Sequence, residues 1–369
     1  MRRVFLLGVL LCACAPTLPP AYVQARDAAE GAYASGHFAD AGKRWLDAAQ
    51  SADTARDRND ARYRAAASYE RAGDFVPARE LYTQLANGNS DRAPRASFAL
   101  ADLQIRAGDE SGGNAALEAA ARKYPSSGVA NLALRRYFAA LAEQGGDRAV
   151  LDYIDRVEPA LDHSELAEQL LYERARRLQA LGDWRHARDA YLVVADRFPY
   201  PHGAHWDDAL FRGADCELGL GQPARAIALL QRMLAAREVS HLSGSYERPR
   251  FADAAYRVAE LYRDELRDPE AAQRAFHGVF MEYPSSTLRD DALWQEALLA
   301  RRALPSSDAP ACAPLRMLVQ QLPESRYAPC AHEICASLPN ILGRECAPYI
   351  ERELHDEATP PSKEPKPAD

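Results

Sequence analysis

The chain has 369 residues, of which 47% are hydrophobic and 27% charged, and its formal net charge is −8. This length is ample for a large core or for an extended array of repeats. The acidic balance argues against nucleic acid or an anionic lipid surface as the main partner.

The first residues have the pattern of a bacterial lipoprotein signal. Arg2 and Arg3 precede the apolar run "VFLLGVLL", which is too short to span a bilayer as a stable helix. The run leads into "LCAC", with a leucine three residues before Cys14 and a small alanine directly before it. Because this resembles a lipobox, we predict that residues 1–13 are removed and that lipid on Cys14 anchors the protein to a membrane. An ordinary secretory signal is the alternative.

Proline-rich segments follow the signal and close the chain. Residues 14–21 are predicted to be a short stiff tether, and residues 356–369 a disordered tail. Helix-type periodicity dominates residues 22–304, where we find no alternating pattern typical of a strand. This region is therefore predicted to be all-α.

Glycines break the helical region at a nearly constant spacing of 35 to 39 residues. They are Gly36, Gly73, Gly108, Gly146, Gly182 and Gly221. A period in the mid-thirties, with a glycine turn between two helices, predicts a solenoid of about seven helical hairpins over residues 22–304.

The residues around these turns resemble the tetratricopeptide family. Its pattern has a small residue near the start of the second helix, an aromatic residue four later and a proline twelve later. Complete copies are Ala187, Tyr191 and Pro199, and Ala272, Phe276 and Pro284. The small residue lets two helices approach closely, the aromatic side chain lies one turn on along the same face, and proline ends the helix.

Two joints, "YPSSTLRDDALWQEALLA" and "PYPHGAHWDDAL", are similar to those of tetratricopeptide lipoproteins of Gram-negative outer membranes. These include the BamD type, a partner of the β-barrel insertase, and the CpoB (YbgF) type, a partner of the Tol–Pal machinery. The resemblance implies a non-catalytic, periplasm-facing scaffold for other envelope proteins, in β-barrel assembly or in coordinating division and the cell wall. A peptidoglycan-binding or peptidoglycan-processing protein is the alternative from another class. The chain departs from the BamD type in having more repeats and a cysteine-rich end.

The family's first helices line a concave groove that binds segments of other proteins. The resemblance places ten residues of this chain there: Tyr63, Ala67, Glu70, Arg71, Gln169, Tyr172, Arg176, Asp208, Phe211 and Asp215. The aromatic residue that recurs at one level, as Tyr63, Tyr172 and Phe211, would form a ladder for apolar anchors. Packing in the core is the alternative for each of these rings.

Four cysteines crowd the predicted cap at residues 305–355. Cys312, Cys330, Cys335 and Cys346 predict two disulfides in an oxidising compartment, with three possible pairings. Helical geometry favours Cys312–Cys335 with Cys330–Cys346, because the level pairing Cys335–Cys346 would leave the other two cysteines about 10 Å apart. Cys216, alone in a helix, is predicted to be a small core residue.

Metal sites are the alternative interpretation of two clusters. Cys330, His332, Cys335 and Cys346 would form a zinc site, but their spacing matches no common pattern. His202 and His205, near Asp207 and Asp208, lie in a predicted turn, where solvated histidines are expected instead of metal ligands. We therefore predict no metal and no cofactor.

Catalytic motifs are not found in the sequence. It has no G-x-S-x-G, no H-E-x-x-H and no phosphate-binding glycine loop, so a catalytic residue and a small-molecule substrate are not expected. Helical superhelices also form the bulk of some transglycosylases, but the chain after Leu304 leaves no room for their catalytic domain.

A longer joint at residues 238–250 is predicted to be a loose surface insertion, with a partner-binding loop as the alternative.

Overall fold

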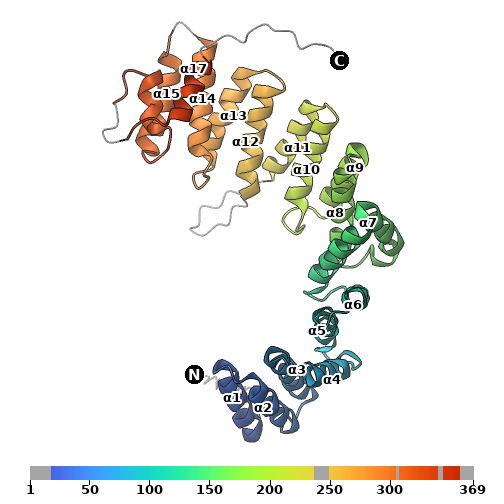
Figure 1. Ribbon diagram of the computed structural model, residues 1–369. Coiled ribbons are helices and arrows are strands. Elements are labelled where there is room, and N and C mark those ends of the chain that lie inside the picture. The colour runs from blue at the N-terminus through green and yellow to red at the C-terminus, as the bar shows by residue number, and fades with distance from the viewer. Residues whose placement is uncertain (1–17, 237–248, 305–306, 340–343, 358–369) are drawn as a thin grey trace, which may run out of the picture. The chain divides into compact units, whose positions relative to one another are not determined.

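The computed structural model describes residues 18–236, 249–304, 307–339 and 344–357, and this part of the chain is helical without any strand (Figure 1). The prediction of an all-α solenoid of helical hairpins is confirmed. The signal, Cys14 and nearly all of the 238–250 joint and of the tail lie outside the described residues. None of the described helices is both long and apolar enough to cross a membrane. The chain divides into two compact units, Met1–Ala167 and Glu168–Asp369, which are treated separately below.

The first unit consists of four consecutive hairpins, the last of which is one kinked helix. Its helices are α1 (Pro20–Ala34), α2 (Phe38–Gln50), α3 (Ala55–Ala72), α4 (Phe75–Ala86), α5 (Ala93–Arg106), α6 (Glu110–Lys123) and α7 (Ala130–Leu161). Within α7 the backbone of Gly146 leaves the helical region, at φ 68° and ψ −173°. This single residue therefore supplies the turn of the fourth hairpin.

The second unit continues with three more hairpins, then α14 and the cysteine-rich region. Its elements are α8 (Ala167–Ala180), α9 (Trp184–Arg197), α10 (Trp206–Gly219), α11 (Pro223–Ala235), α12 (Pro249–Asp264), α13 (Pro269–Glu282), α14 (Arg289–Ala303), α15 (Ala309–Gln321), the 3₁₀ helix η1 (Ala328–Cys330), α16 (Ala331–Ile334) and α17 (Pro348–Glu357). The helix α14 packs on α13 on one side and on α15 on the other.

The turns within the hairpins form where the glycine spacing predicts them. All six glycines of the series have φ between 68° and 90°, a region that residues with a Cβ atom rarely adopt. In the seventh hairpin Arg267 takes this place at φ 53°. Three second helices then begin with an aspartate whose side chain accepts a hydrogen bond from the backbone N–H three residues later: Asp109, Asp183 and Asp268.

In six of the seven hairpins the helices pack through a small residue of the second helix and a large residue four positions later. Every small residue is buried, and every residue four later is at most 3% exposed. The small residues are Ala41, Ala78, Gly113, Ala187, Ala226 and Ala272; their partners four later are Trp45, Tyr82, Leu117, Tyr191, Leu230 and Phe276. At Gly113 a Cβ atom would lie 2.9 Å from the carbonyl oxygen of Ala101, so only glycine fits.

Two disulfides hold the cysteine-rich region together. They join Cys312 to Cys335 and Cys330 to Cys346, so the favoured pairing is confirmed and the alternative zinc site is excluded. The cross-linked segment packs on α14, where the Tyr327 ring stacks on Trp294 with 4.8 Å between centroids. The last hairpin of the second unit is therefore covered by an apolar, covalently linked cap. Cys216 is fully buried in the core, as predicted, and burial raises the pKa of its thiol to about 12.

Candidate partner-binding surface

Side chains of consecutive first helices are linked to one another in the first unit. The first helices are α1, α3, α5 and the part of α7 before Gly146. Their ion pairs join each hairpin to the next: Glu30 to Arg64 at 3.9 Å, Glu70 to Arg106 at 2.8 Å, Asp102 to Arg136 at 2.5 Å, and Asp60 to Arg92. Charged groups on this surface thus stabilise the stacking of hairpins as well as facing solvent.

The four predicted groove residues of α3 have different environments. Glu70 accepts a hydrogen bond from the Tyr82 hydroxyl at 2.9 Å and forms an ion pair with Arg106, so its carboxylate already has partners within the fold. Tyr63 is half-buried against the Tyr82 ring, 5.6 Å between centroids. Arg71 is exposed, with its guanidinium over the ring of Phe38 at 5.5 Å. Ala67, by contrast, lines a pocket.

This pocket, the Trp45 pocket, lies between α1 and α3 with α2 beneath it and has a volume of about 380 Å³. Its lining is Glu30, Tyr33, Ala34, Trp45, Arg64, Ala67 and Ser68. The Arg64 guanidinium lies over the Trp45 ring at 5.0 Å. Tyr33 is 41% exposed and meets the edge of Phe38, 5.0 Å between centroids. Sequence reasoning missed the exposed Tyr33 at this pocket, although an aromatic residue just before the Gly36 turn was a visible signal.

In the second unit Gln169, Tyr172 and Asp208 belong to one polar cluster between α8 and α10. The Tyr172 ring stacks on His205 at 4.1 Å, and His205 is hydrogen-bonded to the Gln169 side chain at 3.1 Å. The Tyr172 hydroxyl donates to Asp208, which also pairs with Arg212 at 2.6 Å and with Arg250 of α12.

The pKa values of Asp208 and Tyr172 also reflect their contacts within the fold. Burial opposes ionisation of Asp208, but hydrogen bonds from Tyr172 and Arg212 and the charges of both arginines hold its pKa below the usual range. Burial and the bond to Asp208 raise the pKa of Tyr172 to about 12. Of the three residues predicted to contact a partner, Tyr172 and Asp208 therefore join neighbouring hairpins and Gln169 is buried.

The remaining predicted residues of this unit are partly accessible. Arg176 pairs with Glu173 at 3.1 Å, and half-buried Phe211 lies under the guanidinium of Arg250 at 4.9 Å. Asp215 is half-buried and makes no hydrogen bond or ion pair with any residue that the structure describes. Burial raises its pKa, although the charges of Arg257, Arg212 and Arg250 act in the opposite direction. Among the described residues, Asp215 is thus a carboxylate without a hydrogen-bond or ion-pair partner.

The recurring aromatic residue packs inside its own hairpin. Tyr63 contacts Tyr82, and Tyr172 contacts Tyr191 at 6.0 Å between centroids. The second residue of each pair then hydrogen-bonds back to the end of the first helix, Tyr82 to Glu70 and Tyr191 to Gln179, both twelve residues apart. Packing within the hairpin accounts for Tyr63, whereas Tyr172 also stacks on His205 before the next hairpin and half-buried Phe211 lies under Arg250.

The histidines of the predicted turn differ from each other. His202 is exposed, as expected of a turn, whereas His205 is half-buried in the stack with Tyr172 and is not simply solvated. No group of three or more histidine, cysteine, aspartate or glutamate side chains suited to a metal occurs in the described segments.

Two segments of the chain match a known protein family. Residues 60–88 and 208–236, which cover most of the α3–α4 hairpin and of the α10–α11 hairpin, match the sequence model of the tetratricopeptide repeat. No curated protein matches the chain.

Several solved structures are similar to this chain at low sequence identity. A tetratricopeptide repeat protein from Parabacteroides merdae is 12% identical, with 75% of this chain and 98% of that one covered and a TM-score of 0.34. The tetratricopeptide domain of P58(IPK) is 14% identical over 91% and 90%, with a TM-score of 0.24. A chain of Naa15/Naa10 bound to HypK-THB is 16% identical over 86% and 50%, with a TM-score of 0.35. At these scores the likeness carries no further argument. The chain thus contains two segments that match the tetratricopeptide repeat, within a helical-hairpin solenoid of the type that such repeats form.

Proposed function

We propose that this protein is a non-catalytic scaffold that binds other envelope proteins through its first-helix surface. In this proposal it is anchored to the outer membrane by lipid on Cys14, faces the periplasm and acts in the assembly of β-barrel proteins. Tetratricopeptide repeats offer extended surfaces for protein partners, which supports the general role. The lipobox-like "LCAC" and the similarity of the joints to outer-membrane lipoproteins support the specific one.

The observation that carries the proposal is the Trp45 pocket. It opens between two first helices and combines an exposed aromatic ring at its rim with small residues, Ala67 and Ser68, along its side. Such a hollow accepts an apolar side chain of a partner, while exposed Arg71 lies one turn beyond Ala67. The two disulfides support a location in an oxidising compartment, since disulfides persist there.

Site-specific photo-crosslinking in Gram-negative cells tests the partner. A photoreactive amino acid replaces Ala67 in the tagged full-length chain, and cross-linked proteins are identified by mass spectrometry. The matched control carries the same group at exposed Lys43 on α2. Capture of a β-barrel insertase subunit from position 67 but not from position 43 supports the assembly role.

Other outcomes are equally decisive. Capture of Tol–Pal or wall-synthesis proteins overturns the assembly role in favour of a coordinator of division or the cell wall. Retention on isolated peptidoglycan favours the peptidoglycan class. No adduct at position 67 above the control overturns the first-helix surface as the binding site. The lipid anchor is tested separately, because Cys14→Ala is expected to release the protein from the membrane fraction.

A further inference from the structure

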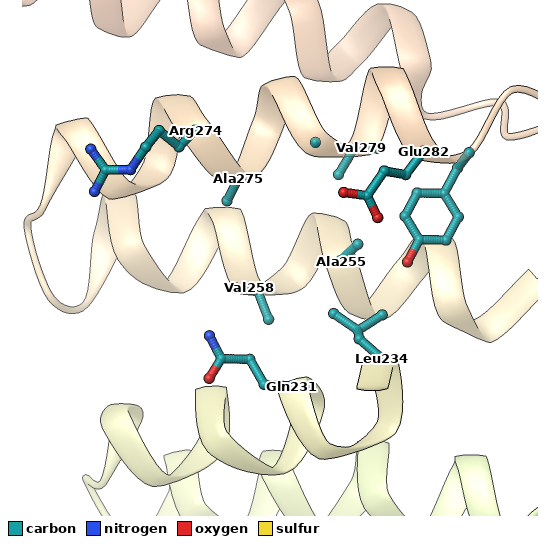
Figure 2. A pocket seen from close by; sticks show the side chains of 10 residues that line it. Gln231, Leu234, Ala255, Val258, Arg274, Ala275, Val279 and Glu282 are labelled. Atoms are coloured by element: carbon teal, nitrogen blue, oxygen red, sulfur yellow. The ribbon is translucent and has the colours of Figure 1, made fainter. Parts of the chain in front are cut away.

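A second pocket lies on the surface formed by the second helices of the hairpins, between two of these helices. It has a volume of about 370 Å³ and opens between α11 and α13, with α12 as its floor (Figure 2). Val258 and Ala255 of α12 form the base, and Leu234 of α11 forms one wall. The other wall is α13, where Arg274 lies at one end of the opening and Glu282 at the other (Figure 2). The apolar interior is therefore bracketed by opposite charges.

Gly278 stands at the middle of this wall. Among the residues that the structure describes, a Cβ atom there would meet only the carboxylate oxygen of Glu282, at 3.8 Å. The glycine at position 113, by contrast, is required because a side chain would collide with α5. Glycine weakens a helix interior relative to alanine, but on an open helix face it lets the backbone of another molecule approach closely.

The exposed face of α13 is complementary to the same face of a second, antiparallel α13 that is related to it by a two-fold axis at Gly278. Arg274 lies four residues before this glycine and Glu282 four residues after it. Ala275 and Met281 lie three residues before and after. Met281 is 59% exposed, and Arg274 has only a distant ion pair of 3.9 Å, to Glu270. A large residue thus mirrors a small one, and a positive residue mirrors a negative one.

We propose that α13 pairs with α13 of a second copy of this chain, antiparallel, with the two-fold axis at Gly278. Arg274 of each copy then faces Glu282 of the other, and Met281 of each copy lies over Ala275 and the pocket beside it. An isologous contact requires such self-complementarity, and a small residue at the crossing point lets two helices approach. Methionine suits the insertion because its flexible thioether adapts to irregular hollows.

The contact is expected to be weak for a protein free in solution. One helix pair covers less than the roughly 1,200–2,000 Å² of a standard stable interface. Anchoring in one plane would raise the effective concentration and favour the pair. The pairing itself does not depend on the proposed function, because α13 and the Trp45 pocket belong to different units; only the gain from anchoring rests on it.

Cysteine crosslinking tests the axis directly. In the purified full-length chain under mild oxidation, the G278C variant is expected to form a covalent dimer, since the two positions meet at the axis. The E270C variant is the matched control on the same helix. Its positions would lie 16 residues apart along an antiparallel pair, about 24 Å, far beyond disulfide reach. Equal crosslinking of the two variants, or none in G278C, overturns the proposal.

Charge exchange tests the register. R274E and E282R each place like charges opposite each other, and each is expected to weaken dimerisation about tenfold or more in sedimentation equilibrium. The double variant R274E/E282R restores opposite charges and is expected to regain the original affinity. Failure of the double variant to recover, with native circular dichroism in all three proteins, overturns the antiparallel pairing. Dimers that form equally in all variants would show that copies meet through another surface.

Discussion

The hydroxyl of Tyr172 donates a hydrogen bond to the carboxylate of Asp208 and so ties α8 to α10. The same carboxylate pairs with Arg250 of α12, so one aspartate joins three consecutive first helices. Residues predicted to meet a partner are here the connection between hairpins. Their substitution is therefore expected to affect stability before it affects binding.

Tyr172→Phe keeps the ring stacked on His205 but removes the donor. A hydrogen bond to a charged group contributes about 1.5–3 kcal/mol, and the free energy of unfolding is expected to fall by that amount. Chemical denaturation followed by circular dichroism measures it. Tyr33→Phe is the control, because the Tyr33 ring is 41% exposed and, among the described residues, its hydroxyl makes no hydrogen bond. Equal effects of the two variants would contradict the structural role of the Tyr172 hydroxyl.

Asp215→Asn is expected to stabilise the second unit at neutral pH. Burial raises the pKa of Asp215 in the folded chain, so its contribution to stability is full below the unfolded value of 3.8 and is lost as pH rises through the folded value. Thermal melting from neutral pH to below 3.8 should show that the excess in melting temperature of Asp215→Asn over the wild type shrinks as the pH falls.

Asp208→Asn is the matched control, for which the melting temperature is expected to change in the opposite direction. The pKa of Asp208 is lowered on folding, so this variant should lose stability at neutral pH and converge with the wild type in acid. A melting temperature of Asp215→Asn that stays below the wild type at neutral pH would refute the assignment.

Two glycines of the first unit should respond oppositely to alanine. At Gly113 a methyl group would lie 2.4 Å from Cγ1 of Ile105, and overpacking of this kind costs about 1–3 kcal/mol. At Gly31 of α1 nothing lies within 4 Å of the new atom, so Gly31→Ala should gain roughly 0.5–1 kcal/mol from helix propensity. Denaturation curves of the two variants provide the comparison. A stabilised Gly113→Ala would mean that α5 and α6 pack less closely than described.

The Cys330–Cys346 disulfide is expected to stabilise the cap. It closes a loop between residues 16 apart, for which the chain-entropy estimate is about 3 kcal/mol. The double variant Cys330→Ala/Cys346→Ala should therefore lower the unfolding free energy of the second unit by this order, with the first unit unaffected. Hydrogen exchange resolved along the chain distinguishes the two units. Loss of protection in α1–α6 would contradict the assignment of the disulfide to a local cap.

The hairpins were predictable because their determinants are local. The glycine series marks turns that require positive φ, and the small and aromatic residues recur at fixed distances within single helices. The favoured disulfide pairing is confirmed, but helix height does not explain it, because Cys335 follows the four-residue α16 and Cys346 precedes α17 outside any helix. The candidate surface was harder to predict. Tyr63 and Glu70 lie in first helices as expected, yet their side chains meet Tyr82 and Arg106 of other helices.

By itself the sequence determined the secondary structure, the period of the repeat and the buried face of each helix, because these follow from backbone conformation and helical periodicity. Only the tertiary structure decided which polar groups are already paired. It brought Glu30, Trp45 and Arg64 together in one pocket, left Asp215 without a partner among the described residues, and placed Gly278 in an open groove. The physical reason is that the contacts between hairpins depend on the angle and register at which neighbouring helices stack. Periodicity within one helix specifies neither of them.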